Sequence, residues 1–306
     1  MIRFFRGAVL AMMCVPSTAE TRDIDGGSAA YRASYLVRVR AIRELIPLAE
    51  QGDADAQTRL GIMYHNWKGM PLDDAEAMKW VRLAAEQGHA PAQTLLGIMY
   101  HYGKGVPQDD AEAVKWFRLA AEQGDARGQT RLGVMYDAGK GVPQDDAEAV
   151  KWFRLAAEQG DARGQTSLGV MYDAGKGVPL DDAEAVKWYR LAAKQGHEGA
   201  QYLLGLRYDG KGVPQDDAEA VKWYRLAAKQ GDGIAQSSLG GMYALGQGVP
   251  QDYVTAHMWT NLGAGLGFAN AAEVRDIVAR LMTPTQIADA QRRARACLAT
   301  NYQDCD

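Results

Sequence analysis

Apolar and small residues along the middle of the chain fall at helical spacing, in two patterns that alternate. From Asp125 onward, the first pattern places Gly128, Leu132, Gly133 and Tyr136 on one side of a helix. Mid-helix glycine costs about 0.5–1 kcal/mol relative to alanine, so its recurrence in every unit indicates that two helices approach closely there. The recurring tyrosine is expected to be a core ring whose hydroxyl reaches a polar partner.

The second pattern predicts a helix from about Asp145 to Gln159. It places Ala149, Trp152 and Phe153 on one side, so that small alanines allow close packing and the tryptophan supplies most of the buried area. The tryptophans at this position are therefore interpreted as wedges in the core. They are Trp80, Trp116, Trp152, Trp188, Trp223 and Trp259.

The two patterns belong to a repeat with a fixed period. Prolines and tryptophans both recur every 36 residues, except for one step of 35 where a residue is missing after Tyr208. Two successive units, 106–141 and 142–177, differ only where Arg131 is replaced by Ser167. A period of this length with two helices per unit predicts a solenoid of helix pairs.

The turn between the two helices contains a glycine–lysine–glycine that invites comparison with a phosphate loop. A phosphate loop needs serine or threonine after the lysine, whereas Lys140 is followed by Gly141 and then by a helix that begins with two aspartates. As a turn, the same residues fit well: Gly139 and Gly141 can adopt positive φ, Asp145 can cap the next helix, and Glu148 completes a capping box. The motif is interpreted as a turn.

Other patterns with chemical potential also have structural explanations. The paired aspartates at helix starts supply too few oxygens for calcium and suit the helix dipole. The histidines His65 and His101 occupy equivalent places in adjacent units, about 8–10 Å apart, which is too far for shared zinc ligation. The chain has no G-x-S-x-G, H-E-x-x-H or S-x-x-K motif. We therefore predict no catalytic residue, no cofactor and no metal site.

The recurring residues resemble the SEL-one-like repeat family, a relative of tetratricopeptide repeats. The resemblance covers about residues 53–267 in six units, and it implies an all-α, right-handed superhelical α/α solenoid. It also implies a non-enzymatic adaptor that binds a protein or peptide on the concave face, lined by the first helices. In one unit the matching residues are Ala92, Leu96, Gly97, Tyr100, Gly103, Gly105, Val106, Asp109, Ala113, Trp116, Ala120, Ala121 and Gly124.

The resemblance leaves two other functions open. One is a periplasmic regulator of a membrane sensor. The other is an enzyme acting on the cell wall or on β-lactams, as described for cysteine-rich relatives; this chain has no cysteine inside any repeat and lacks S-x-x-K. A regular surface favours binding over catalysis, because an active site needs different residue types that converge at one place.

Candidate partner contacts are positions where the units differ on the first helix and in the turn after it. Trp67 stands where the other units have glycine, so it is either an exposed anchor or a residue packed against the N-terminal helix. The candidates are Arg59, His65, Trp67, Leu95, His101, Tyr102, Arg131 and Leu203.

The N-terminus has the features of a signal peptide. Arg3 and Arg6 precede a short apolar run, and small residues predict cleavage after Ala19, so residues 1–19 are expected to be removed and the protein to be periplasmic or secreted. Loss of the two arginines takes the net charge from −4 to −6, which disfavours nucleic acid as a partner. No later apolar run is long enough to span a membrane. Residues 20–52 are expected to form a leader and a capping helix, from Tyr35 to Gln51.

Residues 268–306 are expected to form a helical cap at the other end. One helix is predicted from Asn270 to Leu281, and a capping box at Thr283 and Gln286 starts another, whose arginines could touch an anionic partner. Two cysteines, Cys297 and Cys305, follow. They can form a disulfide if the chain turns near Thr300–Tyr302; otherwise they are free thiols.

Overall fold

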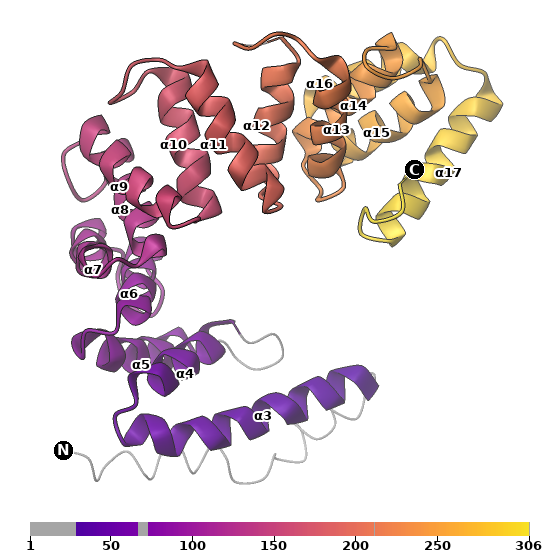
Figure 1. Cartoon of the computed structure of the whole chain (residues 1–306). Coiled ribbons are helices and arrows are strands. Elements are labelled where there is room, and N and C mark those ends of the chain that lie inside the picture. Colours follow the sequence, from indigo (N-terminus) through magenta and orange to yellow (C-terminus); the bar gives the residue numbers. More distant parts are fainter. Residues whose placement is uncertain (1–28, 67–72, 211, 306) are drawn as a thin grey trace. The chain divides into compact units, whose positions relative to one another are not determined.

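The computed structural model describes residues 29–66, 73–210 and 212–305. These residues form fifteen α-helices and no strand, packed in consecutive pairs as in a repeat solenoid (Figure 1). The helices are α3 (Ala29–Glu50), α4 (Ala54–Asn66), α5 (Asp74–Glu86), α6 (Ala90–Tyr102), α7 (Asp110–Glu122), α8 (Ala126–Ala138), α9 (Asp146–Glu158), α10 (Ala162–Ala174), α11 (Asp182–Lys194), α12 (Glu198–Tyr208), α13 (Asp217–Ala228), α14 (Gly233–Leu245), α15 (Tyr253–Gly265), α16 (Ala269–Ala279) and α17 (Pro284–Ala299).

The chain divides into two compact units, the first ending at Asp109 and the second beginning at Asp110. In the first unit the four helices pack in chain order: α3 against α4, α4 against α5, and α5 against α6. In the second unit the same holds from α7 to α16, and α17 packs back against α15. The first helices α8 and α10 of two neighbouring repeats also contact each other directly.

The N-terminal helix α3 is longer than predicted. It begins at Ala29 instead of Tyr35, because residues 29–34, which follow the glycines of the predicted leader, include three alanines and no glycine or proline. The predicted signal peptide, its cleavage site after Ala19 and the candidate Trp67 lie outside the described residues.

The turn that contains Lys140 has the geometry of a helix connection. Gly139 and Gly141 have φ angles of 62° and 69°, and the Asp145 carboxylate accepts hydrogen bonds from two amides of α9, as predicted. The predicted capping box there is wrong: the Glu148 carboxylate binds the Lys151 ammonium at 3.1 Å. The Asp145 amide, which a capping box would offer to Glu148, donates to the carbonyl oxygen of Tyr136 at 3.1 Å instead.

The mid-helix glycines mark close contacts between the two helices of a repeat. A Cβ atom added at Gly133 would lie 2.6 Å from the Phe153 ring, so the prediction of close helix approach is confirmed at this position. The second turn glycine, Gly141, serves the contact with the preceding repeat, because a Cβ there would lie 2.2 Å from the carbonyl oxygen of Asp110.

The structure divides the tryptophans into two groups. Trp80, Trp223 and Trp259 are buried, whereas Trp116, Trp152 and Trp188 are only partly buried. In these middle repeats the fully buried ring belongs to the following residue, at a position 100° further around the helix that points at the first helix. In these three repeats the fully buried ring is thus not the tryptophan expected from the pattern. The buried rings of these three repeats are Phe117, Phe153 and Tyr189, whereas in the fifth repeat Trp223 and Tyr224 are both buried.

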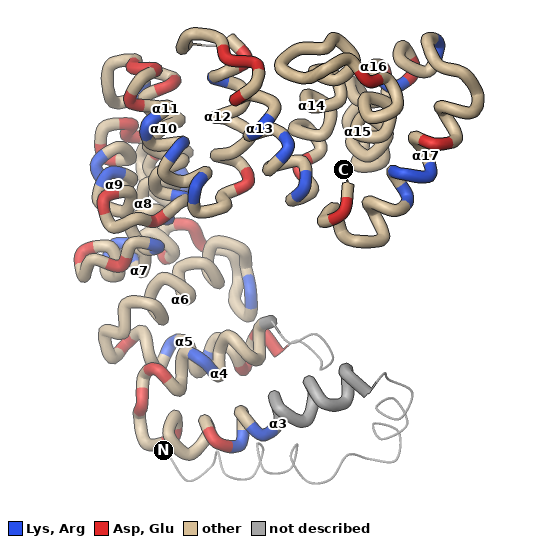
Figure 2. The backbone as a smooth tube through the Cα atoms, turned by 45° about the vertical axis from the view of Figure 1, so that its right-hand side comes forward, with Lys and Arg blue, Asp and Glu red and all other residues tan. Residues whose placement is uncertain are grey.

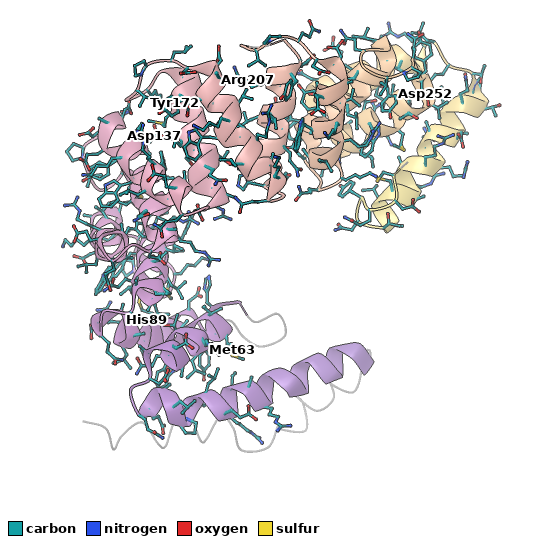
Figure 3. All side chains as sticks on the ribbon, in the orientation of Figure 1. Met63, His89, Asp137, Tyr172, Arg207 and Asp252 are labelled. Atoms are coloured by element: carbon teal, nitrogen blue, oxygen red, sulfur yellow. A yellow bond between two sulfur atoms is a disulfide. The ribbon has the colours of Figure 1, made fainter. Side chains whose placement is uncertain are left out.

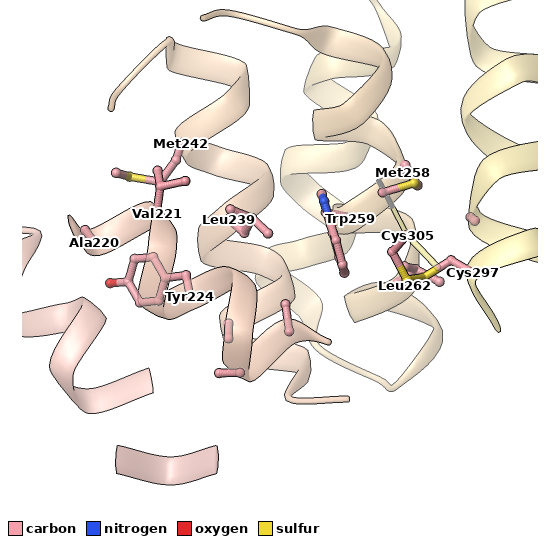
Figure 4. Close-up of a cluster of buried hydrophobic side chains, with 14 residues drawn as sticks. Ala220, Val221, Tyr224, Leu239, Met242, Met258, Trp259, Leu262, Cys297 and Cys305 are labelled. Atoms are coloured by element: carbon pink, nitrogen blue, oxygen red, sulfur yellow. A yellow bond between two sulfur atoms is a disulfide. The ribbon is translucent and has the colours of Figure 1, made fainter. Parts of the chain in front are cut away.

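The C-terminal cap is closed by a disulfide between Cys297 and Cys305, whose Cα atoms lie 4.7 Å apart. The chain makes the required turn at Asn301 and Tyr302, which both have positive φ. Figure 4 shows the two cysteines beside the apolar cluster that includes Trp259. The predicted capping box at the start of α17 is also present.

Candidate partner-binding surface

The first helices of the second unit carry a stripe of solvent-facing residues. On α8 the stripe steps by four, three and four residues, which keeps its members on one side of a helix. All of its residues are exposed or half-buried. We call this surface the first-helix face. It consists of Arg127, Arg131, Val134 and Ala138 on α8, Arg163, Ser167, Val170 and Ala174 on α10, and Leu203 and Leu206 on α12.

Buried glutamines set the positions of these helices. Gln165 donates through Nε2 to the carbonyl oxygen of Ala157 at 3.1 Å, and it accepts from Gln195 Nε2 at 2.8 Å. Each first helix is thereby bound both to the preceding second helix and to its own second helix. Equivalent bonds are made by Gln57, Gln129 and Gln201. Sequence reasoning missed this role, although a glutamine stands at this place in all six units.

The last repeat lacks one half of this arrangement. Leu266 stands where the other repeats have the donating glutamine, and Gln236 Oε1 is buried with no hydrogen-bond partner among the described residues. The first helix of the sixth repeat therefore lacks one of the two glutamine hydrogen bonds that position the first helices of the other repeats.

A second set of bonds links each second helix to the next first helix. Arg154 donates through Nη2 to the Tyr172 hydroxyl at 2.9 Å, and Arg118 does the same to Tyr136 at 2.7 Å. The predicted polar partner of the recurring tyrosine is therefore an arginine of the preceding second helix.

The N-terminal ends of the first helices are tied together through their caps. Thr130 on α8 donates to the Asp161 carboxylate, which caps α10. At the next repeat the cap is His197, whose Nδ1 lies 3.0 Å from Thr166 Oγ1. Burial and the nearby Arg163 lower the pKa of His197, so the neutral imidazole is favoured.

Aspartates at the C-terminal ends of the first helices reach cations of the following repeat. Asp137 Oδ1 lies 3.4 Å from Lys176 Nζ, and Asp173 Oδ1 lies 2.7 Å from Arg207 Nη1. Figure 3 labels Asp137 and Arg207, one member of each pair. Burial raises the pKa of Asp173, and the Arg207 cation opposes that shift. Arg207 is a second residue that sequence reasoning missed; its signal is an arginine at a position where the other five repeats have methionine.

Two of the candidate contacts in the first unit are engaged within the chain. Arg59 forms an ion pair with Asp55 at 2.8 Å on the exposed side of α4. His65 Nδ1 lies 2.5 Å from Asp74 Oδ1, which ties the end of α4 to the start of α5. These contacts neutralise Arg59 locally and give His65 a structural partner.

The remaining candidates of the first unit lie on α6. Leu95 and His101 are half-buried, whereas Tyr102 is 57% exposed. The rings of His101 and Tyr102 meet edge to face with their centroids 4.6 Å apart. The candidates Arg131 and Leu203 belong to the second unit, where both are half-buried members of the first-helix face.

The basic side of the last helix is partly neutralised. Arg292 and Arg293 both bind Asp289 on the same helix, and Arg295 is exposed. Among the described residues no group of three or more His, Cys, Asp or Glu could hold a metal ion. Over the same residues, no helix combines the length and the apolar character needed to cross a membrane.

Comparison with known families decides what these repeats are. The model of the Sel1 repeat matches six times, at residues 54–89, 90–125, 126–161, 162–197, 199–232 and 233–268. This chain belongs to the Sel1 repeat family. The Sel1 repeats thus span 54–268, against the 53–267 expected from the pattern. No curated protein matches the chain.

Two solved Sel1 structures are similar to this chain. One is a protective antigen of uropathogenic Escherichia coli strains that displays an SLR fold, at 40% identity and a TM-score of 0.72 over 85% of this chain. The chain spans 56% of the length of that antigen. The other is a Sel1 repeat protein from Oxalobacter formigenes, at 36% identity and a TM-score of 0.64, covering 70% of this chain and 86% of that one.

Proposed function

We propose that this Sel1 repeat protein is a non-enzymatic adaptor, exported to the periplasm or beyond, that binds a protein or peptide partner across its first-helix face. Sel1 repeats commonly mediate contacts between proteins. Export is supported by the signal-peptide pattern of residues 1–19. The scaffold role is supported by the near-identity of successive repeats, which offer the same side chains at intervals instead of a converging catalytic set.

The observation that carries the proposal is the difference between the two sides of a repeat. On the second helices α9 and α11, Lys151 and Lys187 are paired with glutamates, and Arg154 donates to a tyrosine hydroxyl. On the first-helix face, apolar Val134 and Val170 are exposed beside arginines that no described residue pairs. Leucines of the second helices, such as Leu155 and Leu191, are exposed to the same degree, so the two sides differ in whether their arginines are paired. A surface that leaves its arginines unpaired beside exposed apolar residues is suited to a partner.

The direct contact of α8 with α10 also favours the first helices as the binding side. Helices on the inner side of a curved stack approach each other, whereas outer helices spread apart. A partner lying across α8 and α10 would therefore touch residues of two repeats at once.

Affinity capture from the envelope fraction tests this proposal with matched variants. V134E/V170E places two carboxylates on the first helices, and L155E/L191E places two on the second helices at residues of nearly the same exposure, 39–40% against 39–42%. We expect the wild type and L155E/L191E to capture the same protein, and V134E/V170E to lose it. Loss of that protein from L155E/L191E alone would assign the binding surface to the second helices.

Export is tested separately by mass spectrometry of the protein recovered from cell fractions. The expected mature chain begins at Glu20 and is found in the periplasmic or extracellular fraction. A full-length chain recovered from the cytoplasm would contradict export without affecting the adaptor role.

A further inference from the structure

Three arginines on the first-helix face have no anionic partner among the described residues. Arg127 and Arg163 stand at equivalent places on α8 and α10, and both are exposed; Arg131 lies one turn after Arg127 and is half-buried. Figure 2 marks the cationic residues along these helices in blue. The equivalent pair on α4 is Asp55 and Arg59, which neutralise each other. At these two places α8 therefore carries two cations where α4 carries an ion pair, and α10 carries one cation and a serine.

This replacement has an electrostatic cost in the free protein. Like charges four residues apart on a helix repel, so Arg127 and Arg131 destabilise α8 slightly. Arg127 and Arg163 also lie in the first turn of their helices, where the helix dipole disfavours a cation. An anionic ligand that lies across α8 and α10 would offset both effects.

Apolar residues adjoin the arginines on the same face. Val134 and Val170 each lie one to two turns after the arginines, and both are exposed. On α12 the face continues as Leu203 and Leu206, and the bond between Arg207 and Asp173 holds α12 beside α10. A ligand that neutralises the arginines would thus also meet an apolar strip.

We propose that the partner presents an extended acidic segment with interspersed apolar side chains. Its carboxylates bind Arg127, Arg131 and Arg163, and its apolar side chains lie on Val134 and Val170. Arginine suits this role because its planar guanidinium binds carboxylates through two hydrogen bonds. The inference rests on the adaptor role proposed above and adds the chemistry of the partner.

Selection from a random library of displayed 12-residue peptides tests the charge preference, with three purified proteins as targets. The first is the wild type. The second is R127D/R163D, which introduces the residue that the first repeat carries as Asp55. The third is K194E, a charge-reversal control that copies Glu158 at the equivalent place on a second helix. We expect the wild type and K194E to enrich peptides rich in Asp and Glu, and R127D/R163D to lose that enrichment.

One enriched peptide then tests the individual residues by fluorescence anisotropy. R131S and S167R exchange the single residue that distinguishes two otherwise identical repeats, so both substitutions fit the fold. We expect R131S to weaken and S167R to strengthen binding of the acidic peptide by about threefold each, as one exposed ion pair does.

The outcomes separate this inference from the proposed function. Peptides enriched without acidic bias, whose binding is lost in V134E/V170E, would overturn the acidic segment and leave the face as the binding surface. An acidic bias that persists in R127D/R163D would assign the preference to other residues and overturn the inference. Tighter binding of a single-stranded oligonucleotide than of any enriched peptide would do the same, because it would make phosphate the preferred anion.

If the wild type enriches no peptide while V134E/V170E still abolishes partner capture from the envelope, the partner is not an extended segment. That result would overturn the inference alone.

Discussion

Arg207 on α12 holds Asp173 on α10 with both guanidinium Nη atoms 2.7 Å from the carboxylate oxygens. Both side chains are largely buried, and a second carboxylate, Asp182, lies 3.7 Å from Arg207 Nη1. The fourth and fifth repeats are thus joined by a charge pair that involves a position where the other five repeats have a methionine, buried in four of them. This junction is also where one residue is missing from the repeat, after Tyr208.

Replacing Arg207 by methionine tests whether this pair has become essential. R207M restores the residue of the other repeats but leaves Asp173 buried without its cation, so we expect the free energy of unfolding to fall by about 2 kcal/mol in urea denaturation. The double variant D173A/R207M should recover most of that loss, because neither charge remains. Equal stability of R207M and the wild type would show that the pair contributes nothing.

Two glycine substitutions should have opposite effects on stability. Gly133→Ala inserts a methyl group 2.6 Å from the Phe153 ring, so it should destabilise the protein in spite of alanine's higher helix propensity. Gly241→Ala, also within a first helix, meets no atom within 4 Å and should stabilise it by about 0.5–1 kcal/mol. Thermal unfolding of both variants measures the difference. Stabilisation by both would show that the helices of the third repeat have room to separate.

Truncation of the two adjacent aromatics of α9 measures which one fills the core. Phe153 is 2% exposed, so Phe153→Ala should cost about 3–5 kcal/mol, as for other buried large side chains. Trp152 is half-buried with a lysine ammonium 5.3 Å from its ring, so Trp152→Ala should cost less. Denaturant unfolding gives both values. A larger loss of stability from Trp152→Ala than from Phe153→Ala would show that the tryptophan contributes more to the core.

The buried histidine of the last repeat should make stability depend on pH. His257 is buried with Nδ1 unpartnered, and burial lowers its pKa, with Arg275 acting in the same direction and Asp276 against it. The folded state therefore binds a proton less readily than the unfolded state. Stability should be highest above pH about 6.5 and should fall as the pH drops below that value.

His257→Val isolates this contribution, because four of the other five repeats have valine at the equivalent place; Val221 is one example. We expect the variant to be more stable by about 1 kcal/mol at pH 8, since an unpartnered polar group is removed. The advantage should widen at pH 5, and urea midpoints at the two pH values measure it. The same advantage at both pH values would mean that His257 does not titrate during unfolding.

The fold could be predicted from the sequence because the same structural requirements recur in every repeat. A turn needs positive φ at Gly139 and a close contact needs a missing side chain at Gly133, and both requirements recur in phase. The sequence did not reveal which of two adjacent rings, Trp152 or Phe153, enters the core. The apolar stripe of this helix includes both residues, so it does not fix how the helix is rotated about its axis, and that rotation decides which ring is buried.

The candidate surface was harder to predict for a different reason. Variable positions identify residues that the fold does not need, but they do not show which are already engaged. Arg59 is paired with Asp55 and His65 with Asp74. Arg127 stands at a position that varies as much as theirs, but it has no ion partner in the described part of the chain. Pairing between side chains depends on geometry that position in the repeat does not specify.

Photo-crosslinking in intact cells tests the central claim most directly, namely that a partner binds across the first helices. A photoreactive phenylalanine analogue is placed at Val134 on the first-helix face or at Leu155 on a second helix, two residues that are each 39% exposed. We expect the Val134 position to give a discrete crosslinked product with one protein and the Leu155 position to give none. A discrete product from Leu155 with none from Val134 would contradict the account.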